Sequence, residues 1–359
     1  MSSRALLVAA LAVACTAEPA TITIGAAGPW NEGYGAMNKR GIDLAISEIN
    51  AAGGVRGHPL RLLDFDDAGD GARAAAIAEQ FAGDPAVTAV VGHVSSRAMV
   101  AAAKIYDGRL AAVATTATSP DLTGISPWVF RVAASDSTTG GQLAQFAHRL
   151  DAARVSILYE NDAYGRGLAE AFRSNFNGRI ISVDPIPSGG TADFEPYVAY
   201  LVERRPELVF VAGTEASGMA LLREARRQRL TGDFLGGDGW AGVVNEPSAT
   251  GAFVGSPFTA SDQRPEARQF VEAFRARYSM LPDANAALAY DATRLVARVI
   301  GEVGTDRRAV RDRLASLDER SAHLGVTGPI RFRDTGDRVT NALVIARVEA
   351  GELVATVGR

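Results

Sequence analysis

Short apolar runs alternate with amphipathic stretches along most of this chain. The apolar runs are rich in β-branched residues and therefore predict strands. In the N-terminal half they fall at residues 21–24, 60–65, 87–91 and 110–114. From Ile42 to Ile49, apolar residues recur at i, i+3, i+4 and i+7, which predicts one buried face of a helix that ends at Gly53. Further helices are predicted at residues 72–81 and 98–106.

A second series of the same kind follows. It predicts strands at residues 155–159, 180–183 and 208–211 and a helix at residues 167–176. In both series a strand ends in a short loop that opens a helix. We therefore predict an α/β fold of two Rossmann-like lobes, each a parallel sheet flanked by helices. Ligands of such sheets bind at the carboxyl ends of the strands, so two facing sheets predict a binding cleft between the lobes.

The composition is compatible with two globular lobes. The 359 residues are 47% hydrophobic and 22% charged, with a formal net charge of −4. A chain of this length suits two α/β lobes better than a single core. The 37 Lys and Arg residues are interspersed with 41 Asp and Glu residues. Because no basic stripe is present, no nucleic-acid partner is expected.

The N-terminus carries a separate signal. Arg4 precedes an apolar run that ends at Cys15, the single cysteine of the sequence. This pattern predicts a lipoprotein signal peptide over residues 1–14 and a lipid on Cys15, which would hold the protein on the periplasmic or extracellular face of a membrane through that anchor only. An ordinary cleaved signal is the alternative, because residues 12–14 also suit cleavage. The run is about half the roughly 20 residues of a membrane-spanning helix.

Hydroxyl and carboxyl side chains follow the predicted strands where ligands bind. Ser96 lies between a strand and a helix, and Thr116 and Thr118 follow the next strand. Asp238 lies in a turn between glycines. An α-amino acid needs hydroxyls and helix-start amides for its carboxylate and an acid for its ammonium, and these residues offer both. Structural explanations remain open, since Ser96 and Asp136 are helix N-cap types and Asp238 can be a turn residue.

Motifs for enzymatic chemistry are weak. Gly25 and Gly28 follow a strand, as in a nicotinamide-binding turn, but residues 29–31 do not continue into a helix and a third glycine is misplaced. No Gly-x-Ser-x-Gly elbow is present, and the four histidines lack the spacing of metal ligands. We expect a protein that is not an enzyme and needs no metal or cofactor. A nicotinamide-dependent oxidoreductase is the remote alternative.

A series of landmarks carries a resemblance to a known family. In order they are RG at 40–41, INAAGGVRG at 49–57, FDD at 65–67, VGH at 91–93, TATSPDL at 116–122, DAYGRG at 162–167, GGDGW at 236–240 and AYDA at 289–292. The chain resembles the type I periplasmic binding proteins, in the leucine/isoleucine/valine-binding branch that delivers amino acids to ABC transporters. The resemblance implies a hinge of three crossovers near Asp136, Phe258 and Asn341. The implied lobes are residues 20–136 with 259–341, and residues 137–258 with 342–359.

The resemblance also implies roles for residues at the strand ends. Ser96 and Thr118, with the backbone near Thr116, match the positions that hold the α-carboxylate of the ligand. Asp238 matches the acid that pairs with the α-ammonium. Asp136 matches an acid near the hinge on the same side.

Other matches concern the walls of the cleft. Trp30, Tyr34 and Tyr164 match cleft-lining positions, although packing alone also explains an aromatic residue. Glu215 stands in the loop where a tyrosine often closes over the ligand, and Arg97 stands where a small polar residue is common. If Glu215 and Arg97 face the cleft, they suit a polar side chain or an amide on the ligand. The alternative is that both are solvated surface charges.

These features predict a solute-binding protein in which a small amino acid or amino-acid-like ligand bridges two lobes and favours closure of a hinge. Ser96, Thr116 and Thr118 would hold the ligand from one lobe, and Tyr164 and Glu215 from the other. We expect delivery to an ABC permease, with branched-chain amino acids as the ligand class. A ligand-sensing receptor of the same fold, which takes amides or small aromatics and has a signalling partner, is the alternative.

Overall fold

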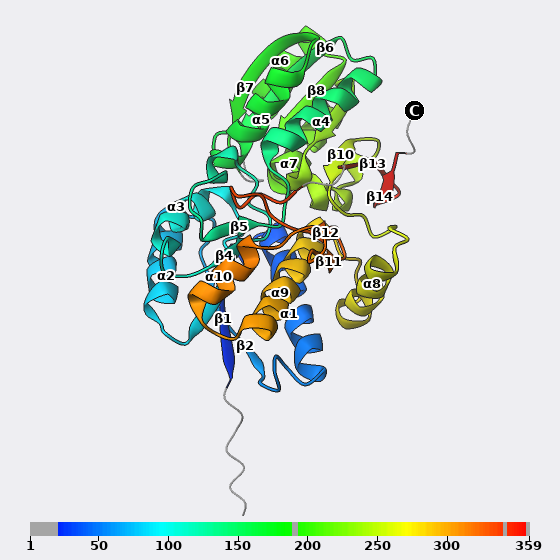
Figure 1. Ribbon diagram of the computed structural model, residues 1–359. Coiled ribbons are helices and arrows are strands. Elements are labelled where there is room, and N and C mark those ends of the chain that lie inside the picture. Colours follow the sequence, from blue (N-terminus) through cyan, green and yellow to red (C-terminus); the bar gives the residue numbers. More distant parts are fainter. Residues whose placement is uncertain (1–20, 189–192, 340–342, 357–359) are drawn as a thin grey trace, which may run out of the picture.

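The computed structural model describes residues 21–188, 193–339 and 343–356. They form two lobes, each built on a β-sheet with helices on both faces (Figure 1). The predicted two-lobed α/β class is therefore confirmed. The predicted signal peptide at residues 1–14 and the lipidation site Cys15 lie outside the described residues.

Within the described residues, the first lobe has a five-stranded parallel sheet in the order β2-β1-β3-β4-β5. Its strands are β1 (Ile22–Gly28), β2 (Leu60–Asp66), β3 (Val87–Gly92), β4 (Ala112–Ala114) and β5 (Val129–Arg131). All residues of β1 and β3 are buried. This is the burial expected of central parallel strands that are covered on both faces.

The helices of the first lobe come from two separate parts of the chain, residues 33–122 and residues 265–315. They are α1 (Gly33–Ala51), α2 (Gly71–Gly83), α3 (Ser96–Tyr106), η1 (Pro120–Leu122), α8 (Pro265–Tyr278), α9 (Ala284–Val303) and α10 (Arg307–Ala315). Apolar residues of α2 and α3 pack on one face of the sheet, and those of α1, α9 and α10 on the other (Figure 1). β11 (His323–Gly325) and β12 (Gly328–Ile330) form an antiparallel pair.

In the described part of the second lobe, seven strands form a sheet in the order β14-β13-β10-β9-β8-β6-β7. They are β6 (Arg154–Glu160), β7 (Arg179–Ile186), β8 (Leu208–Ala212), β9 (Asp233–Gly236), β10 (Phe253–Ser256), β13 (Val344–Glu349) and β14 (Glu352–Ala355). The sequence predicts a wholly parallel sheet, but β13 and β14 are antiparallel to their neighbours. The C-terminal segment returns to this lobe and adds a hairpin to the sheet edge.

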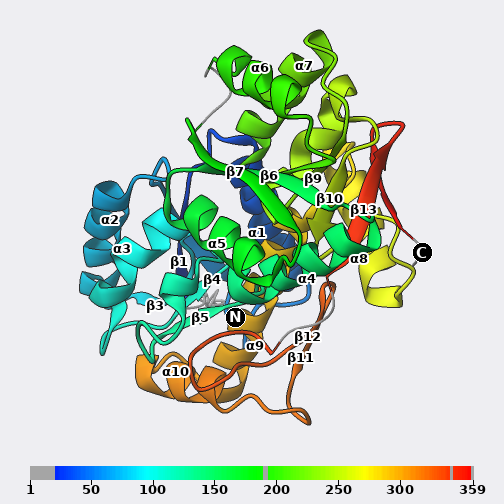
Figure 2. The ribbon, with the colours of Figure 1, turned by 90° about the horizontal axis from the view of Figure 1, so that it is seen from above.

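Helices also cover both faces of the second sheet. They are α4 (Asp136–Arg149), α5 (Ala163–Asn175), α6 (Glu195–Arg204), α7 (Glu215–Arg227) and the short 3₁₀ helices η2 (Asp238–Asn245) and η3 (Pro247–Ala249). Figure 2 shows α4 and α5 on one side of the strands and α6 and α7 on the other.

Several predicted elements differ from the structure in their limits. The helix predicted from Ile42 is α1, which begins at Gly33, and the strand predicted to end at residue 24 is β1, which continues through Gly28. Gly25 lies against Phe81, where a Cβ atom would be 3.0 Å from the ring. Gly25 and Gly28 are therefore buried strand residues and not a phosphate-binding turn, which removes the basis of the nicotinamide alternative. α5 begins at Ala163 and not at residue 167, because Asp162 caps it by accepting a hydrogen bond from the Gly165 amide at 2.8 Å.

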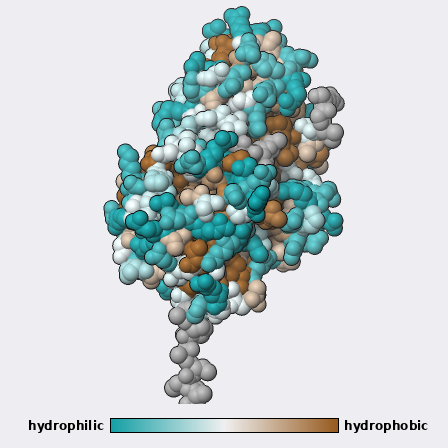
Figure 3. All heavy atoms as spheres, in the orientation of Figure 1, coloured by the Kyte–Doolittle hydropathy of each residue, from teal (hydrophilic) through white to brown (hydrophobic). Residues whose placement is uncertain are grey.

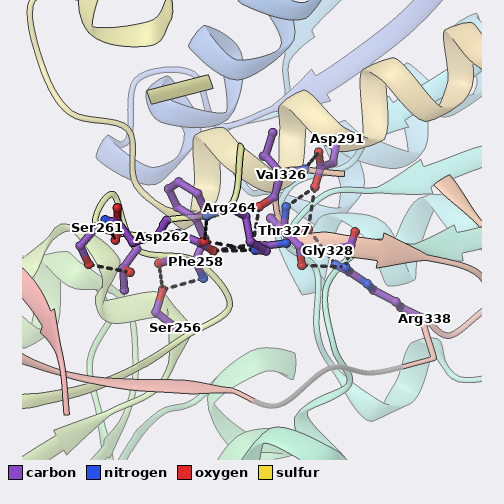
Figure 4. Close-up of polar contacts among 12 residues, drawn as sticks. Ser256, Phe258, Ser261, Asp262, Arg264, Asp291, Val326, Thr327, Gly328 and Arg338 are labelled. Atoms are coloured by element: carbon purple, nitrogen blue, oxygen red, sulfur yellow. Dashed lines mark hydrogen bonds and ion pairs between the residues drawn. The ribbon is translucent and has the colours of Figure 1, made fainter. Parts of the chain in front are cut away.

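A buried polar network lies where the chain passes between the lobes (Figure 4). Arg338, 5% exposed, donates to the carbonyls of Val132 at 2.8 Å and Thr327 at 3.0 Å. The carboxylate of Asp291 in α9 accepts from the amides of Val326 at 2.7 Å and Thr327 at 2.9 Å. The network joins the segment after β5 to the segments around β12, and so it fixes the first-lobe side of the hinge region. The exact lobe boundaries remain predictions, and Asn341 lies outside the described residues.

The face of the molecule seen in Figure 3 is mainly hydrophilic over both lobes, with hydrophobic residues in small groups. None of the helices in the described ranges combines the length and apolar character required to cross a membrane.

Candidate functional site

A cavity of about 60 Å³ lies between the two lobes. Its first-lobe wall comes from α1, the loops after β3 and β4, and the start of α9. Its second-lobe wall comes from the starts of α5 and η2 and the loop before α7. The lining residues are Tyr34, Val94, Ser95, Ser96, Thr116, Asp162, Tyr164, Thr214, Asp238, Gly239 and Asn285. α1 also contacts α7 and η2, and α3 contacts α5, so the lobes touch each other around the cavity.

Of the nine predicted ligand-binding residues, five line this cavity, namely Tyr34, Ser96, Thr116, Tyr164 and Asp238. They come from five separate elements or loops. The fold therefore brings together residues that the sequence distributes along more than half of the chain.

Ser96 fastens the loop after β4 to the start of α3. Its Oγ accepts hydrogen bonds from the amides of Thr118 and Ser119, each at 3.1 Å. The N-cap of α3 is Ser95, whose Oγ accepts from the Ala98 amide at 3.3 Å, so capping does not explain Ser96. A hydroxyl that accepts two hydrogen bonds still has a proton to donate, and Ser96 faces the cavity.

The two threonines of the next loop are placed differently. Thr116 lines the cavity, and its hydroxyl donates to the Val94 carbonyl at 3.1 Å and accepts from Asn38 Nδ2 at 3.4 Å. Thr118 lies behind the cavity wall. Its Oγ1 is buried and interacts with the carboxyl group of Asp136. Its carbonyl accepts from the Asp136 amide at 2.9 Å.

Arg131 connects this loop to the hinge region. It is 2% exposed, and its Nη1 donates to the carbonyls of Thr118 at 2.8 Å and Ser119 at 2.7 Å. Its guanidinium also forms an ion pair with Asp337, which lies just before the last passage between the lobes. Arg131 therefore holds the hydroxyl-bearing loop in one position relative to the hinge.

On the second lobe, Tyr164 and Asp238 form a polar pair. The Tyr164 hydroxyl donates to Asp238 Oδ1 at 3.0 Å and accepts from the Gly239 amide at 3.0 Å. Burial raises the pKa of Asp238 to about 6, although the hydrogen bond from Tyr164 acts in the opposite direction. The pair presents a carboxyl group to the cavity.

Asp136 is a second acid close to the first. It is the first residue of α4, and the N-cap is Ser135, so the capping explanation for Asp136 is wrong. Its side chain is fully buried, and the Thr118 hydroxyl and the Arg131 guanidinium interact with its carboxyl group and act to lower its pKa. Burial, and then the charge of Asp238, raise the pKa of Asp136 well above its usual value. Such a group favours the approach of a cation.

Trp30 and Glu215 are not among the residues that line the cavity. Trp30 packs against the core of the first lobe. The carboxyl group of Glu215 lies beside Gly33 of the other lobe, and burial raises its pKa to about 7. Glu215 is therefore not a solvated surface charge. The side chain of Arg97 is 51% exposed and lies 3.9 Å from Asp162.

The prediction omitted several lining residues, among them Asp162 and Asn285. Asp162 is the N-cap of α5, and Asn285 donates through Nδ2 to Asp283, the N-cap of α9, at 3.0 Å. The sequence signal for both is an aspartate before a helical stretch. That signal predicts a helix start, but it does not indicate which helix starts face the cavity.

Two lobes with mainly parallel sheets that close on a polar cavity define a solute-binding protein of the type I periplasmic class. The chain belongs to the periplasmic binding protein family, whose sequence profile matches residues 21–352. The resemblance carried by the sequence landmarks is thus confirmed.

Relatives with known names support the same class. An amino acid binding protein of Pseudomonas aeruginosa is 32% identical over 292 residues, 76% of each chain. A Leu/Ile/Val-binding protein of Rhizobium johnstonii is 29% identical over an alignment of 363 residues, 98% of each chain. The crystal structure of LivJ, the branched-chain amino acid transporter substrate binding protein of Streptococcus pneumoniae, in complex with isoleucine, superimposes with a TM-score of 0.86. The identity is 27%, and the match covers 94% of this chain and 98% of that one.

Proposed function

We propose that this protein binds an α-amino acid between its lobes and delivers it to an ABC permease. The observation that carries the proposal is the arrangement of complementary groups across one cavity. Hydroxyls and a helix start lie on the first lobe, and the Tyr164–Asp238 pair lies on the second. This polarity matches the two charged ends of a zwitterion.

The first-lobe groups suit the carboxylate. Ser96 can donate its hydroxyl proton. The backbone amides of the first turn of α3 point out of the N-terminal end of the helix, where Ser96 lies. Because the positive end of the helix dipole lies there, a carboxylate is stabilised at this position. Thr116 lines the same wall, and its hydroxyl, which donates to the Val94 carbonyl, holds the loop after β4 in place.

The acids suit the ammonium. Asp238 lines the cavity, and Asp136 is buried close enough to Asp238 for the two charges to interact. Burial raises the pKa of both acids, and repulsion by the charge of Asp238 raises the pKa of Asp136 further. A ligand ammonium would relieve this repulsion and restore the ionised form of Asp238.

The remaining space favours a small side chain on the ligand. The cavity of about 60 Å³ is smaller than the roughly 150 Å³ cavity that takes up benzene. Val94 is the single aliphatic side chain among the lining residues within the described ranges. The relatives that bind leucine, isoleucine and valine support the amino-acid class, and the small volume makes alanine, serine, threonine and valine the first ligands to test.

A thermal-shift series tests the proposal. At 100 times its Kd, a ligand stabilises the fold by about 2.7 kcal/mol, which corresponds to roughly 5 to 10 °C in Tm for lobes of this size. Each amino acid is compared with its N-acetyl derivative and its amide, which lack one charged end. A shift caused equally by all three forms, or by none of a full amino-acid panel, contradicts a zwitterion site.

Three further points complete the proposal. The lobes close about a hinge near Asp136, Phe258 and Asn341, which is supported by the change of sheet membership after β5, β10 and β12. The protein acts by binding and not by catalysis, as the family assignment supports. A lipid on Cys15 anchors it outside the cytoplasm, and this part is supported by the sequence pattern alone.

A further inference from the structure

Glu215 occupies a narrow slot between two glycines of opposite lobes. It is the first residue of α7 in the second lobe. A Cβ atom at Gly33, the first residue of α1 in the first lobe, would collide with Glu215 Oε1. A Cβ atom at Gly242 of η2 would collide with Glu215 Oε2. At both glycines, the three atoms nearest to the added Cβ all belong to Glu215, so this side chain fills the space beside both glycines.

The start of α1 lacks the cap that a helix usually supplies for itself. Its N-cap residue, Glu32, makes no hydrogen bond with its side chain, and no acidic residue lies in the first turn. The backbone amides of Tyr34 and Gly242 instead donate hydrogen bonds to the carboxyl group of Glu215. A side chain of one lobe thus satisfies an amide at the helix start of the other lobe, which is the usual task of an N-cap.

This contact can form only when the lobes are together. We propose that Glu215 is a latch that holds the closed state, and that the Glu215–Gly33 contact sets ligand affinity through the closed fraction of the protein. Glu215 is then a positioning residue, since it does not line the cavity. The effect on affinity rests on the proposed function, because it requires that the ligand is bound in the closed cleft. Any change in the closed fraction changes the apparent Kd by the same factor.

A double-mutant cycle tests the latch. Glu215→Ala removes the carboxyl group and should weaken ligand binding roughly 5- to 30-fold, as expected from two lost hydrogen bonds. Gly33→Ala should have a similar effect, because its methyl group occupies the slot. The double variant should bind no more weakly than Glu215→Ala alone, since the collision partner of the methyl group is then absent. Glu215→Gln, which fills the slot and keeps one acceptor oxygen but sets an NH2 group against the second backbone amide, should weaken binding less than Glu215→Ala.

A glycine of the same lobe provides the control. Gly83 ends α2, has no atom within 4 Å of an added Cβ and does not have a positive φ. Gly83→Ala should therefore leave affinity unchanged. If Gly33→Ala and Glu215→Ala weaken binding by factors that simply multiply, the two residues do not act through one contact and the latch is contradicted.

A second measurement does not depend on the ligand. Spin labels on cysteines at the exposed positions Gln80 in α2 and Glu203 in α6, in a Cys15→Ser background, report the distance between the lobes. In ligand-free protein, Glu215→Ala should shift the distance distribution toward the open state. An unchanged distribution overturns the latch.

L-Leucine, L-alanine and L-serine serve as the probes of affinity. If no member of the full amino-acid panel binds, the proposed function is contradicted, and the label distances still decide the latch.

Discussion

Ligand binding should become tighter when the pH falls from 8 to 6, because Glu215 takes up a proton when the lobes close. In an open cleft its carboxyl group is solvated and has an ordinary pKa near 4.5, whereas in the closed structure burial, then Asp283 and then Glu32, raise the pKa to about 7. The closed state therefore binds the proton more tightly than the open state. The stabilisation of the closed state by this proton is complete below about pH 4.5 and is lost as the pH rises through about 7.

The size of the effect follows from these two values. One pKa unit corresponds to about 1.4 kcal/mol. Closure takes up a proton only below about pH 7, so about one pH unit of the interval from pH 8 to pH 6 contributes to the change in affinity. The wild-type protein should therefore bind its ligand about ten-fold more tightly at pH 6 than at pH 8 through Glu215 alone. The charged groups that face Glu215, Asp283 at the start of α9 and Glu32 before α1, are both acidic and reinforce the shift.

Asp238 has the opposite influence. Burial raises the pKa of Asp238 to about 6, so this carboxyl group becomes neutral at lower pH and its pairing with an ammonium weakens. Calorimetric titration from pH 5.5 to 8.5 on the wild type and on Glu215→Gln separates the two effects, since the variant keeps Asp238 but cannot titrate at position 215. The ratio of the two Kd values should change about ten-fold between pH 6 and pH 8. A ratio that is independent of pH refutes the reasoning.

Further predictions concern the site, its support and the anchor. Asp238→Ala should weaken ligand binding by roughly 2 to 5 kcal/mol, measured by calorimetry, because an ammonium loses its buried partner; binding as tight as in the wild type would show that Asp238 does not pair with it. Ser96→Ala should weaken binding by roughly 1 to 3 kcal/mol and also lower Tm, since it leaves the two amides that Ser96 accepts from without a partner; an unchanged Tm contradicts this role. Arg131→Lys should reduce stability by roughly 2 to 4 kcal/mol in urea unfolding, since an ammonium cannot reproduce the branched contacts of the buried guanidinium; stability equal to that of the wild type would contradict it. Cys15→Ser should release the protein from the membrane fraction of a bacterial host without changing ligand affinity, and a wild-type protein found free of lipid would contradict the anchor.

The sequence by itself determined the fold class, the family, most elements up to β8 and five of the residues that line the cavity. Helical and strand spacing depend on neighbouring residues, so α2, β3 and α3 were predicted close to their observed limits, whereas the helix predicted from Ile42 begins at Gly33. Ser96, Thr116 and Asp238 were found because they follow strands, and the carboxyl ends of parallel strands meet at one edge of a sheet. Local rules of this kind need no knowledge of distant segments.

The tertiary structure decided how the single residues are used. Ser95 and Ser135 cap their helices, while Ser96 and Asp136, one position later, face the loop and the buried interior; two adjacent polar residues cannot be distinguished by composition. The slot of Glu215 depends on Gly33, which lies in another lobe and far away in the sequence. The antiparallel strand β13 reaches the second sheet only after the first lobe is complete. Burial, neighbouring acids and contacts across the cleft all arise from the packing of distant segments, and this is why only the folded chain defines them.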